Sequence, residues 1–145
     1  MSRLDDAEKL FRDGFNCSQA VLSVFAGDMD IEVETALKIA CAFGGGMRLG
    51  NTCGAVTGAL MVIGLKYGKS KAEDNEARDR TYALAKEFQA AFSKIRGSII
   101  CRDLLGYDLS TPEGYEAARE NLAFIKICPG LVRDAVEILE EIIKK

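Results

Sequence analysis

Apolar residues recur along most of the chain at intervals of three and four positions, which is the spacing of one face of an α-helix. Alternating apolar and polar positions, the pattern of a half-buried strand, have little support, and only two prolines interrupt the chain. The sequence therefore predicts an all-α fold, a single compact helical domain over residues 1–145 with about six to eight helices.

Capping residues, glycines and prolines divide this pattern into separate helices. The predicted helices cover about residues 3–13, 17–26, 33–43, 53–67 and 71–96, a short segment after Ser98, about 112–127, and a last helix that starts at Pro129. The expected N-caps are Ser2, Asn16, either Asn51 or Thr52, and Ser70. The longest helix is expected to bury Leu84, Phe88, Ala91, Phe92 and Ile95.

The predicted helix over about residues 53–67 is apolar on nearly every side, which places it at the centre of the bundle. Gly54 and Gly58 lie four positions apart and therefore share one face of this helix. A glycine inside a helix costs up to about 1 kcal/mol relative to alanine. We expect this bare face to let another backbone come close.

Composition and charge exclude several classes of partner. The chain has 145 residues, of which 48% are hydrophobic, and its 19 basic and 22 acidic residues give a net charge of −3. This balance offers no basic surface for nucleic acid or for an anionic membrane. The first residues do not form the basic and then apolar run of a signal peptide, and the longest apolar stretch, residues 55–65, is too short to span a bilayer. We expect a cytoplasmic protein that does not insert into membranes.

Histidine is absent, whereas cysteine occurs five times, at Cys17, Cys41, Cys53, Cys101 and Cys128. Without histidine, neither a Ser-His-Asp triad nor a Cys-His pair is available, and no imidazole can bind a metal. In a reducing cytosol, cysteines are more often catalytic, redox-active or metal-binding than joined in structural disulfides. Cysteine chemistry is therefore the first place to look for a function.

Four of the five cysteines fall at predicted helix N-termini, where unpaired N–H groups and the helix dipole favour a thiolate. These four are Cys17, Cys53, Cys101 and Cys128. The pKa of Cys53 is predicted to lie well below that of a free thiol. Cys41 lies inside a predicted helix, and we interpret it as a packed core residue. From placement alone, a shared redox or metal role and a structural role are supported equally.

Short motifs around these cysteines are similar to a known family. They are Asn16-Cys17-Ser18-Gln19-Ala20-Val21, Phe43-Gly44-Gly45-Gly46-Met47 and Cys53-Gly54-Ala55-Val56-Thr57-Gly58, followed by the lone Cys101 and Cys128. In this order they resemble the family of redox-active proteins defined by four cysteines and a C-G-A-x-x-G motif. The resemblance covers about Phe11 to Cys128, leaves Cys41 outside, and implies a small bacterial or archaeal protein with redox-active cysteines.

The leading hypothesis is a thiol–disulfide oxidoreductase. Cys53 is the expected nucleophile, because it combines a helix start with the bare surroundings of Gly54 and Gly58. Cys17 is the expected resolving partner, and Cys101 and Cys128 form a second pair. The redox partner is either another protein or a small thiol. The corresponding geometric prediction is that at least two of the four lie within disulfide reach in an accessible cleft beside Gly54 and Gly58, while Cys41 stays apart.

Two alternatives from other classes stay open. In the first, Cys17, Cys53, Cys101 and Cys128 together hold one zinc ion or an iron–sulfur cluster, for which four thiolates are suitable ligands. In the second, the cysteines are packing residues of a helical interaction module. The inner stripe of the longest helix then serves either the core or a self-associating face, as in a homodimer.

The glycine-rich run Gly44-Gly45-Gly46-Met47-Arg48-Leu49-Gly50 does not match a phosphate-binding loop, and no strand precedes it. We interpret it as a tight connection between the third and fourth helices. Arg48 in this run is a candidate supporting residue that holds a thiolate or a small anion near Cys53.

Overall fold

The computed structural model describes residues 2–144, and the α-helices in this part number eight. They are α1 (Arg3–Arg12), α2 (Cys17–Ala26), α3 (Val33–Ala40), α4 (Gly54–Tyr67), α5 (Asn75–Arg96), α6 (Cys101–Leu105), α7 (Pro112–Glu120) and α8 (Ala123–Ile143). The predicted all-α bundle is confirmed for residues 2–144. Met1 and Lys145, the ends of the predicted 1–145 domain, lie outside the described residues.

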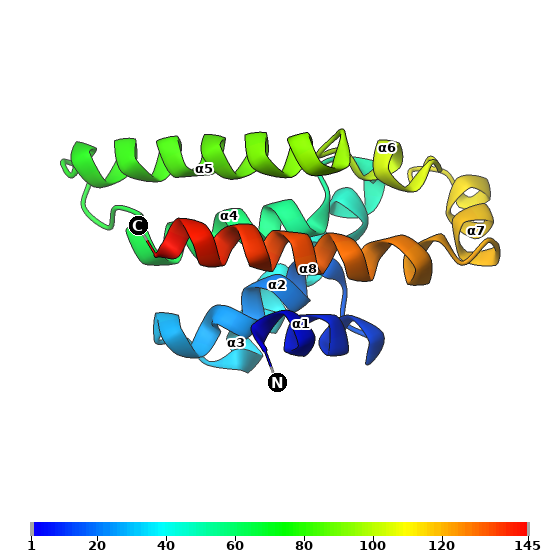
Figure 1. Cartoon of the computed structure of the whole chain (residues 1–145), viewed down its shortest axis with the longest axis horizontal. Coiled ribbons are helices and arrows are strands. Elements are labelled where there is room, and N and C mark those ends of the chain that lie inside the picture. Colours follow the sequence, from blue (N-terminus) through cyan, green and yellow to red (C-terminus); the bar gives the residue numbers. More distant parts are fainter. Residues whose placement is uncertain (1, 145) are drawn as a thin grey trace.

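Helix α4 occupies the middle of the bundle. It packs against α2 on one side and against α5 and α8 on the other, while α8 also covers α1 (Figure 1). Its fully buried side chains include Val56, Ala59, Val62 and Ile63, so it is enclosed along most of its length. The prediction of a central apolar helix is confirmed.

The two glycines of α4 make its close contact with α2 possible. A Cβ atom at Gly58 would lie 2.9 Å from the carbonyl oxygen of Ser18 and 3.1 Å from its Cα. At Gly54 it would lie 3.1 Å from the backbone nitrogen of Ser18. The expected close approach of another backbone therefore occurs, and it brings the start of α2, with Cys17, against the start of α4.

Several predicted helix ends are wrong. Helix α8 begins at Ala123 rather than Pro129, because Leu122 takes a left-handed conformation with φ of 60° that ends α7 and allows a new helix to start. Pro129 is then an interior residue of α8. Helix α5 begins at Asn75 because Asp74, not Ser70, accepts the capping hydrogen bond, from Ala77 N at 3.1 Å.

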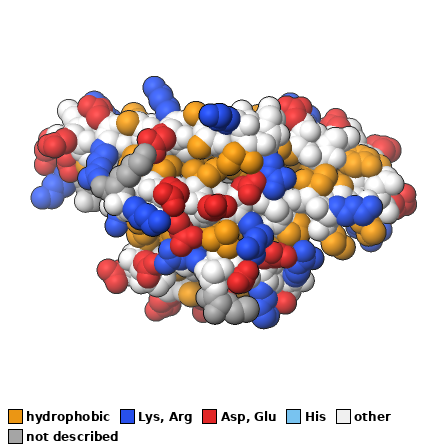
Figure 2. Space-filling model, viewed as in Figure 1, with side chains coloured by type: hydrophobic (Ala, Val, Ile, Leu, Met, Phe, Trp, Pro, Cys, Tyr) orange, Lys and Arg blue, Asp and Glu red, His pale blue; other side chains and the backbone are white. Residues whose placement is uncertain are grey.

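The predicted inner stripe of α5 is confirmed only in its middle. Phe88 and Phe92 are fully buried, whereas Ile95 is 60% exposed. Ile95 instead lines an open groove of about 580 Å³ between α5 and α8, with Ile138, Glu137 and other residues. Figure 2 shows apolar side chains gathered along this groove between charged ones. Among residues 2–144, no helix has the length and apolar character that crossing a membrane requires.

Candidate functional site

The helix packing brings the four predicted cysteines to one cavity of about 290 Å³. Its lining residues include Cys17, Cys53, Cys101 and Cys128, together with Gly54 and Arg48, whereas Gly58 does not line it. The four cysteines are only 3–6% exposed. Residues that lie up to 111 positions apart by number thus meet at one place, as a shared function of the four cysteines requires.

Cys41 does not behave as predicted. We expected it in the core, but its side chain is exposed. The reason is that α3 ends at Ala40 and Cys41 opens a 3-10 turn, whose backbone is held by a hydrogen bond from Asn16 Nδ2 to the Cys41 carbonyl oxygen at 2.8 Å. Cys41 is also not among the lining residues of the cavity.

Cys17 is placed by a capping box at the start of α2. The Asn16 side chain accepts a hydrogen bond from Gln19 N at 3.0 Å, and the Gln19 side chain accepts one from Asn16 N, also at 3.0 Å. The Ser18 hydroxyl donates to the Ala40 carbonyl oxygen at 2.7 Å and ties this helix start to α3. The predicted Asn16 cap is confirmed, and it fixes where the Cys17 side chain enters the cavity.

Cys53 and Cys101 are positioned by pairing between the segments that precede α4 and α6. Cys53 N donates to Ile99 O at 2.8 Å, and Cys101 N donates to Asn51 O at 2.6 Å. Thr52 and Ile100 form an isolated antiparallel bridge between these two bonds. Cys53 itself, rather than the predicted Asn51 or Thr52, is the N-cap residue of α4. The backbone pairing was not predicted.

Cys128 reaches the cavity from the interior of α8, not from a helix N-terminus as predicted. Because α8 begins at Ala123, the favourable helix-end N–H groups are not available to this sulfur. The aromatic ring of Phe124 lies one helical turn earlier and lines the same cavity. Three of the four predicted helix-start placements, those of Cys17, Cys53 and Cys101, are therefore confirmed.

The prediction that Cys53 titrates below a free thiol is wrong. Burial raises the pKa of Cys53 to about 11, although backbone hydrogen bonds from Ala55 and Val56 and the nearby Arg96 guanidinium act in the opposite direction. Burial also raises the pKa of Cys101 to about 12, helped by Cys53 and Cys128 and opposed by Arg48. The helix N-terminus lowers the pKa of the thiol, but the loss of hydration on burial raises it by more.

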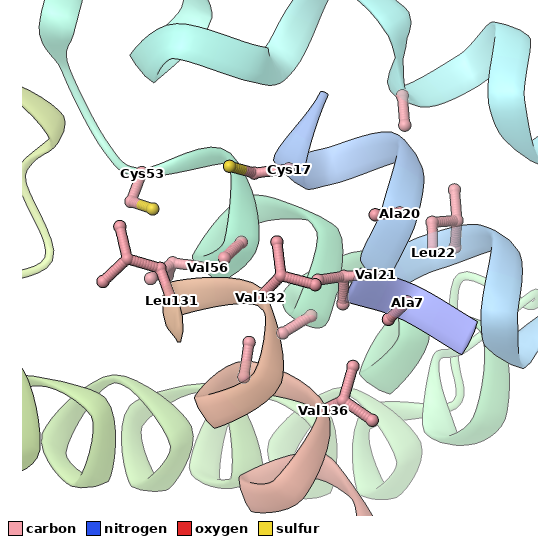
Figure 3. Packing of buried hydrophobic residues seen from close by; sticks show 14 of the residues in the cluster. Ala7, Cys17, Ala20, Val21, Leu22, Cys53, Val56, Leu131, Val132 and Val136 are labelled. Carbon is pink, nitrogen blue, oxygen red and sulfur yellow. The ribbon is translucent and has the colours of Figure 1, made fainter. Parts of the chain in front are cut away.

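Two further contacts relate the sulfur atoms to one another. A hydrogen bond with the Cys128 thiol, followed by burial, raises the pKa of Cys17 well above its ordinary value. Figure 3 shows the side chains of Cys17 and Cys53 pointing toward one another across the cavity, from the starts of α2 and α4. Cys17 therefore lies near both Cys53 and Cys128.

The glycine-rich run forms a tight left-handed turn at the cavity. Gly45, Gly46, Met47 and Arg48 have φ values of 65°, 64°, 59° and 65°, and Asn51 N closes the turn on Gly46 O at 2.9 Å. A Cβ at Gly46 would lie 2.3 Å from Asn51 N, so this position requires glycine. The expected tight connection is confirmed, and it carries Arg48 to the cavity.

The aromatic walls of the cavity were missed from sequence. They are formed by Phe11, Phe15, Tyr115 and Phe124. The spacing offered a partial signal, because Phe124 and Cys128 are four positions apart and share a helix face. Nothing comparable marks Tyr115, which comes from α7 and packs on Phe124 with ring centroids 5.4 Å apart.

Comparison with known proteins gives one match. A family model described as "Putative redox-active protein (C_GCAxxG_C_C)" matches residues 15–142 and so includes all four cavity cysteines. No curated protein and no solved structure matches the chain. The local string in this chain, Cys53-Gly54-Ala55, has cysteine before glycine, the reverse of the order in the family's printed name. Within residues 2–144, no three histidine, cysteine, aspartate or glutamate side chains are grouped so that they could hold a metal ion.

Proposed function

The chain belongs to this redox-active family, and on that premise we propose that its four cavity cysteines carry out thiol–disulfide exchange. The observation that carries the proposal is the meeting of four thiols from distant segments around one cavity, which a packing role for cysteine does not require. A disulfide partner supplies the oxidising equivalents, and the site operates in the reducing cytoplasm of a bacterium or archaeon.

Cys53 is the attacking thiol in this proposal. The backbone N–H groups of Ala55 and Val56 at the start of α4 lower the pKa of Cys53 and so favour its thiolate, against the effect of burial. The Cys53 thiolate attacks one sulfur of a substrate disulfide, a bond forms between the two sulfurs, and the other substrate half leaves as a thiolate. That leaving group takes up the proton which Cys53 released.

Cys17 then resolves the mixed disulfide, because its side chain points toward Cys53. Its sulfur attacks the Cys53 sulfur, and the second substrate half leaves as a thiol with the proton of Cys17. The two cysteines lose two electrons and become a Cys17–Cys53 disulfide, while the substrate disulfide gains two electrons and becomes two thiols.

The contact between Cys17 and Cys128 supplies a route onward to the second pair. The Cys128 sulfur attacks Cys17 in the new disulfide and releases Cys53 as a thiol. Cys101 then attacks Cys128, which restores the Cys17 thiol and leaves a Cys101–Cys128 disulfide. This internal exchange neither oxidises nor reduces the protein as a whole, because one disulfide replaces another. It frees Cys53 for a second substrate.

The raised pKa values predict a strong dependence of the first step on pH. With a pKa of about 11, only a small fraction of Cys53 is thiolate near neutrality. The rate of attack is therefore expected to rise about tenfold per pH unit between about pH 7 and pH 10, because the thiolate is the reacting form.

Trapping of the mixed disulfide tests the assignment. The fully reduced protein is mixed with 2-hydroxyethyl disulfide and analysed intact by mass spectrometry, in a Cys41→Ser background that removes the exposed thiol. Cys17→Ser is expected to accumulate an adduct on Cys53, whereas Cys53→Ser forms none in the same time. An adduct that forms equally fast on Cys53→Ser would contradict the role of Cys53.

A further inference from the structure

The cavity is suited to a small molecule rather than to a folded protein partner. Its volume of about 290 Å³ lies near the lower limit for small-molecule sites. The four cysteines around it are only 3–6% exposed, so a disulfide on the surface of another protein has little access to their sulfurs. Aromatic side chains of Phe11, Phe15, Tyr115 and Phe124 form much of its wall.

The charge on the lining of the cavity is of one sign only, positive. Among the described residues that line the cavity, Arg48 is the single charged one, and none is an aspartate, glutamate or lysine. Arg48 forms no ion pair with a carboxylate in residues 2–144; its Nη1 donates to the Gly44 carbonyl oxygen at 3.1 Å. Its guanidinium lies 5.7 Å from the centre of the Tyr115 ring. A guanidinium has five N–H donors, so most of its donors remain available to an anion.

The backbone that carries Arg48 is strained. Met47 and Arg48 both have side chains and yet adopt left-handed conformations, with φ of 59° and 65°. Each such residue costs of order 1 kcal/mol or more, and such strain concentrates at ligand-binding sites. The guanidinium also folds over Gly45, where a Cβ would lie 2.7 Å from Nη1. The turn therefore holds the charged group at the cavity at an energetic cost.

We infer that the substrate of this site is a low-molecular-weight disulfide that carries a carboxylate, with the carboxylate on Arg48 and the sulfur–sulfur bond near Cys53. The inference rests on the proposed thiol–disulfide exchange and adds the substrate class. Both sulfurs of the substrate leave as carboxylate-bearing thiols, and Cys53 and Cys17 supply the two electrons. Arg48 is then a binding residue that touches the substrate.

Three disulfides of different charge test the inference. Fully reduced protein with Cys41→Ser is mixed separately with 3,3′-dithiodipropionate, neutral 2-hydroxyethyl disulfide and cationic cystamine, and the released thiol is followed over time. The anionic disulfide is expected to react about tenfold faster than the neutral one, a preference that corresponds to about 1.4 kcal/mol. Cystamine is expected to react more slowly than both, and added salt should reduce the differences.

Variants of arginine separate substrate binding from support of a thiolate. Arg48→Gln is expected to slow the anionic disulfide more than the neutral one, so that the two react at similar rates, and Arg48→Lys should restore part of the preference. Arg102→Gln is the matched control, since Arg102 follows Cys101 and is exposed but does not line the cavity. It should keep the preference.

The outcomes distinguish a failure of the proposed substrate class from a failure of the proposed thiol–disulfide exchange. Equal rates for the three disulfides in the parent, or an equal loss for anionic and neutral disulfides in Arg48→Gln, would overturn the substrate class and leave thiol–disulfide exchange intact. A parent protein that reduces none of the three would contradict the proposed function itself.

Discussion

Replacing Gly58 by alanine tests how the start of α2, and with it Cys17, is held at the cavity. The added Cβ would lie 2.9 Å from Ser18 O, 3.1 Å from Ser18 Cα and 3.3 Å from Val21 Cβ, and two of these atoms are backbone. Such overpacking costs about 1–3 kcal/mol, while the better helix propensity of alanine returns up to about 1 kcal/mol. We expect Gly58→Ala to lower the free energy of unfolding by about 1–2 kcal/mol.

Gly64 in the same helix is the matched control, because no atom lies within 4 Å of a Cβ built there. Gly64→Ala should raise the free energy of unfolding by about 0.5–1 kcal/mol. Urea unfolding followed by circular dichroism measures both variants, and the reduced parent provides the reference. A Gly58→Ala variant as stable as Gly64→Ala would show that the close contact between α2 and α4 does not exist.

Three other predictions concern the cysteines. Stability should be constant below about pH 8 and fall between about pH 9 and pH 11, because the unfolded chain loses the Cys53 proton near its ordinary pKa of 9.0 while the folded chain keeps it until about 11. Urea unfolding across this range measures it, and a slope unchanged in Cys53→Ala would contradict the raised pKa. Iodoacetamide should modify exposed Cys41 much faster than the four cavity cysteines in the native protein, as mass-spectrometric mapping can check; equal rates would mean that the cavity is open. Protein purified without oxygen should contain less than about half an equivalent of zinc or iron by elemental analysis, and full occupancy would favour the metal-binding alternative.

Much of the fold could be predicted because local rules agree with the tertiary structure. The apolar character of residues 53–67 requires burial on all sides, and α4 is indeed central. Asn16 caps α2 as expected, and Gly54 and Gly58 face another backbone. The prediction failed at Pro129. Proline is most favourable in the first turn of a helix, so the sequence predicted that the last helix starts there. The left-handed Leu122 upstream starts α8 earlier and leaves the proline inside.

The candidate site could be predicted in its members but not in its electrostatics. Three of the four sulfurs lie at helix starts as predicted, although only the start of α2 carries the predicted side-chain cap. Burial of the same sulfurs depends on which other helices cover them, and this information is not local. The pKa of Cys53 rises for that reason, although the predicted N–H donors are present. The pairing of the segments before α4 and α6 is equally non-local, because it joins residues 51–53 with residues 99–101.

We propose that the four cavity cysteines form one redox centre within a single chain. Equilibration of the Cys41→Ser protein with an excess of a small disulfide, followed by blocking of free thiols and mass-spectrometric mapping, tests it directly. We expect a folded monomer that loses all four thiols and gains two disulfides within the chain, confined to Cys17, Cys53, Cys101 and Cys128. A folded protein that keeps all four free thiols at full excess of the disulfide, or that forms disulfides only between chains, would contradict it.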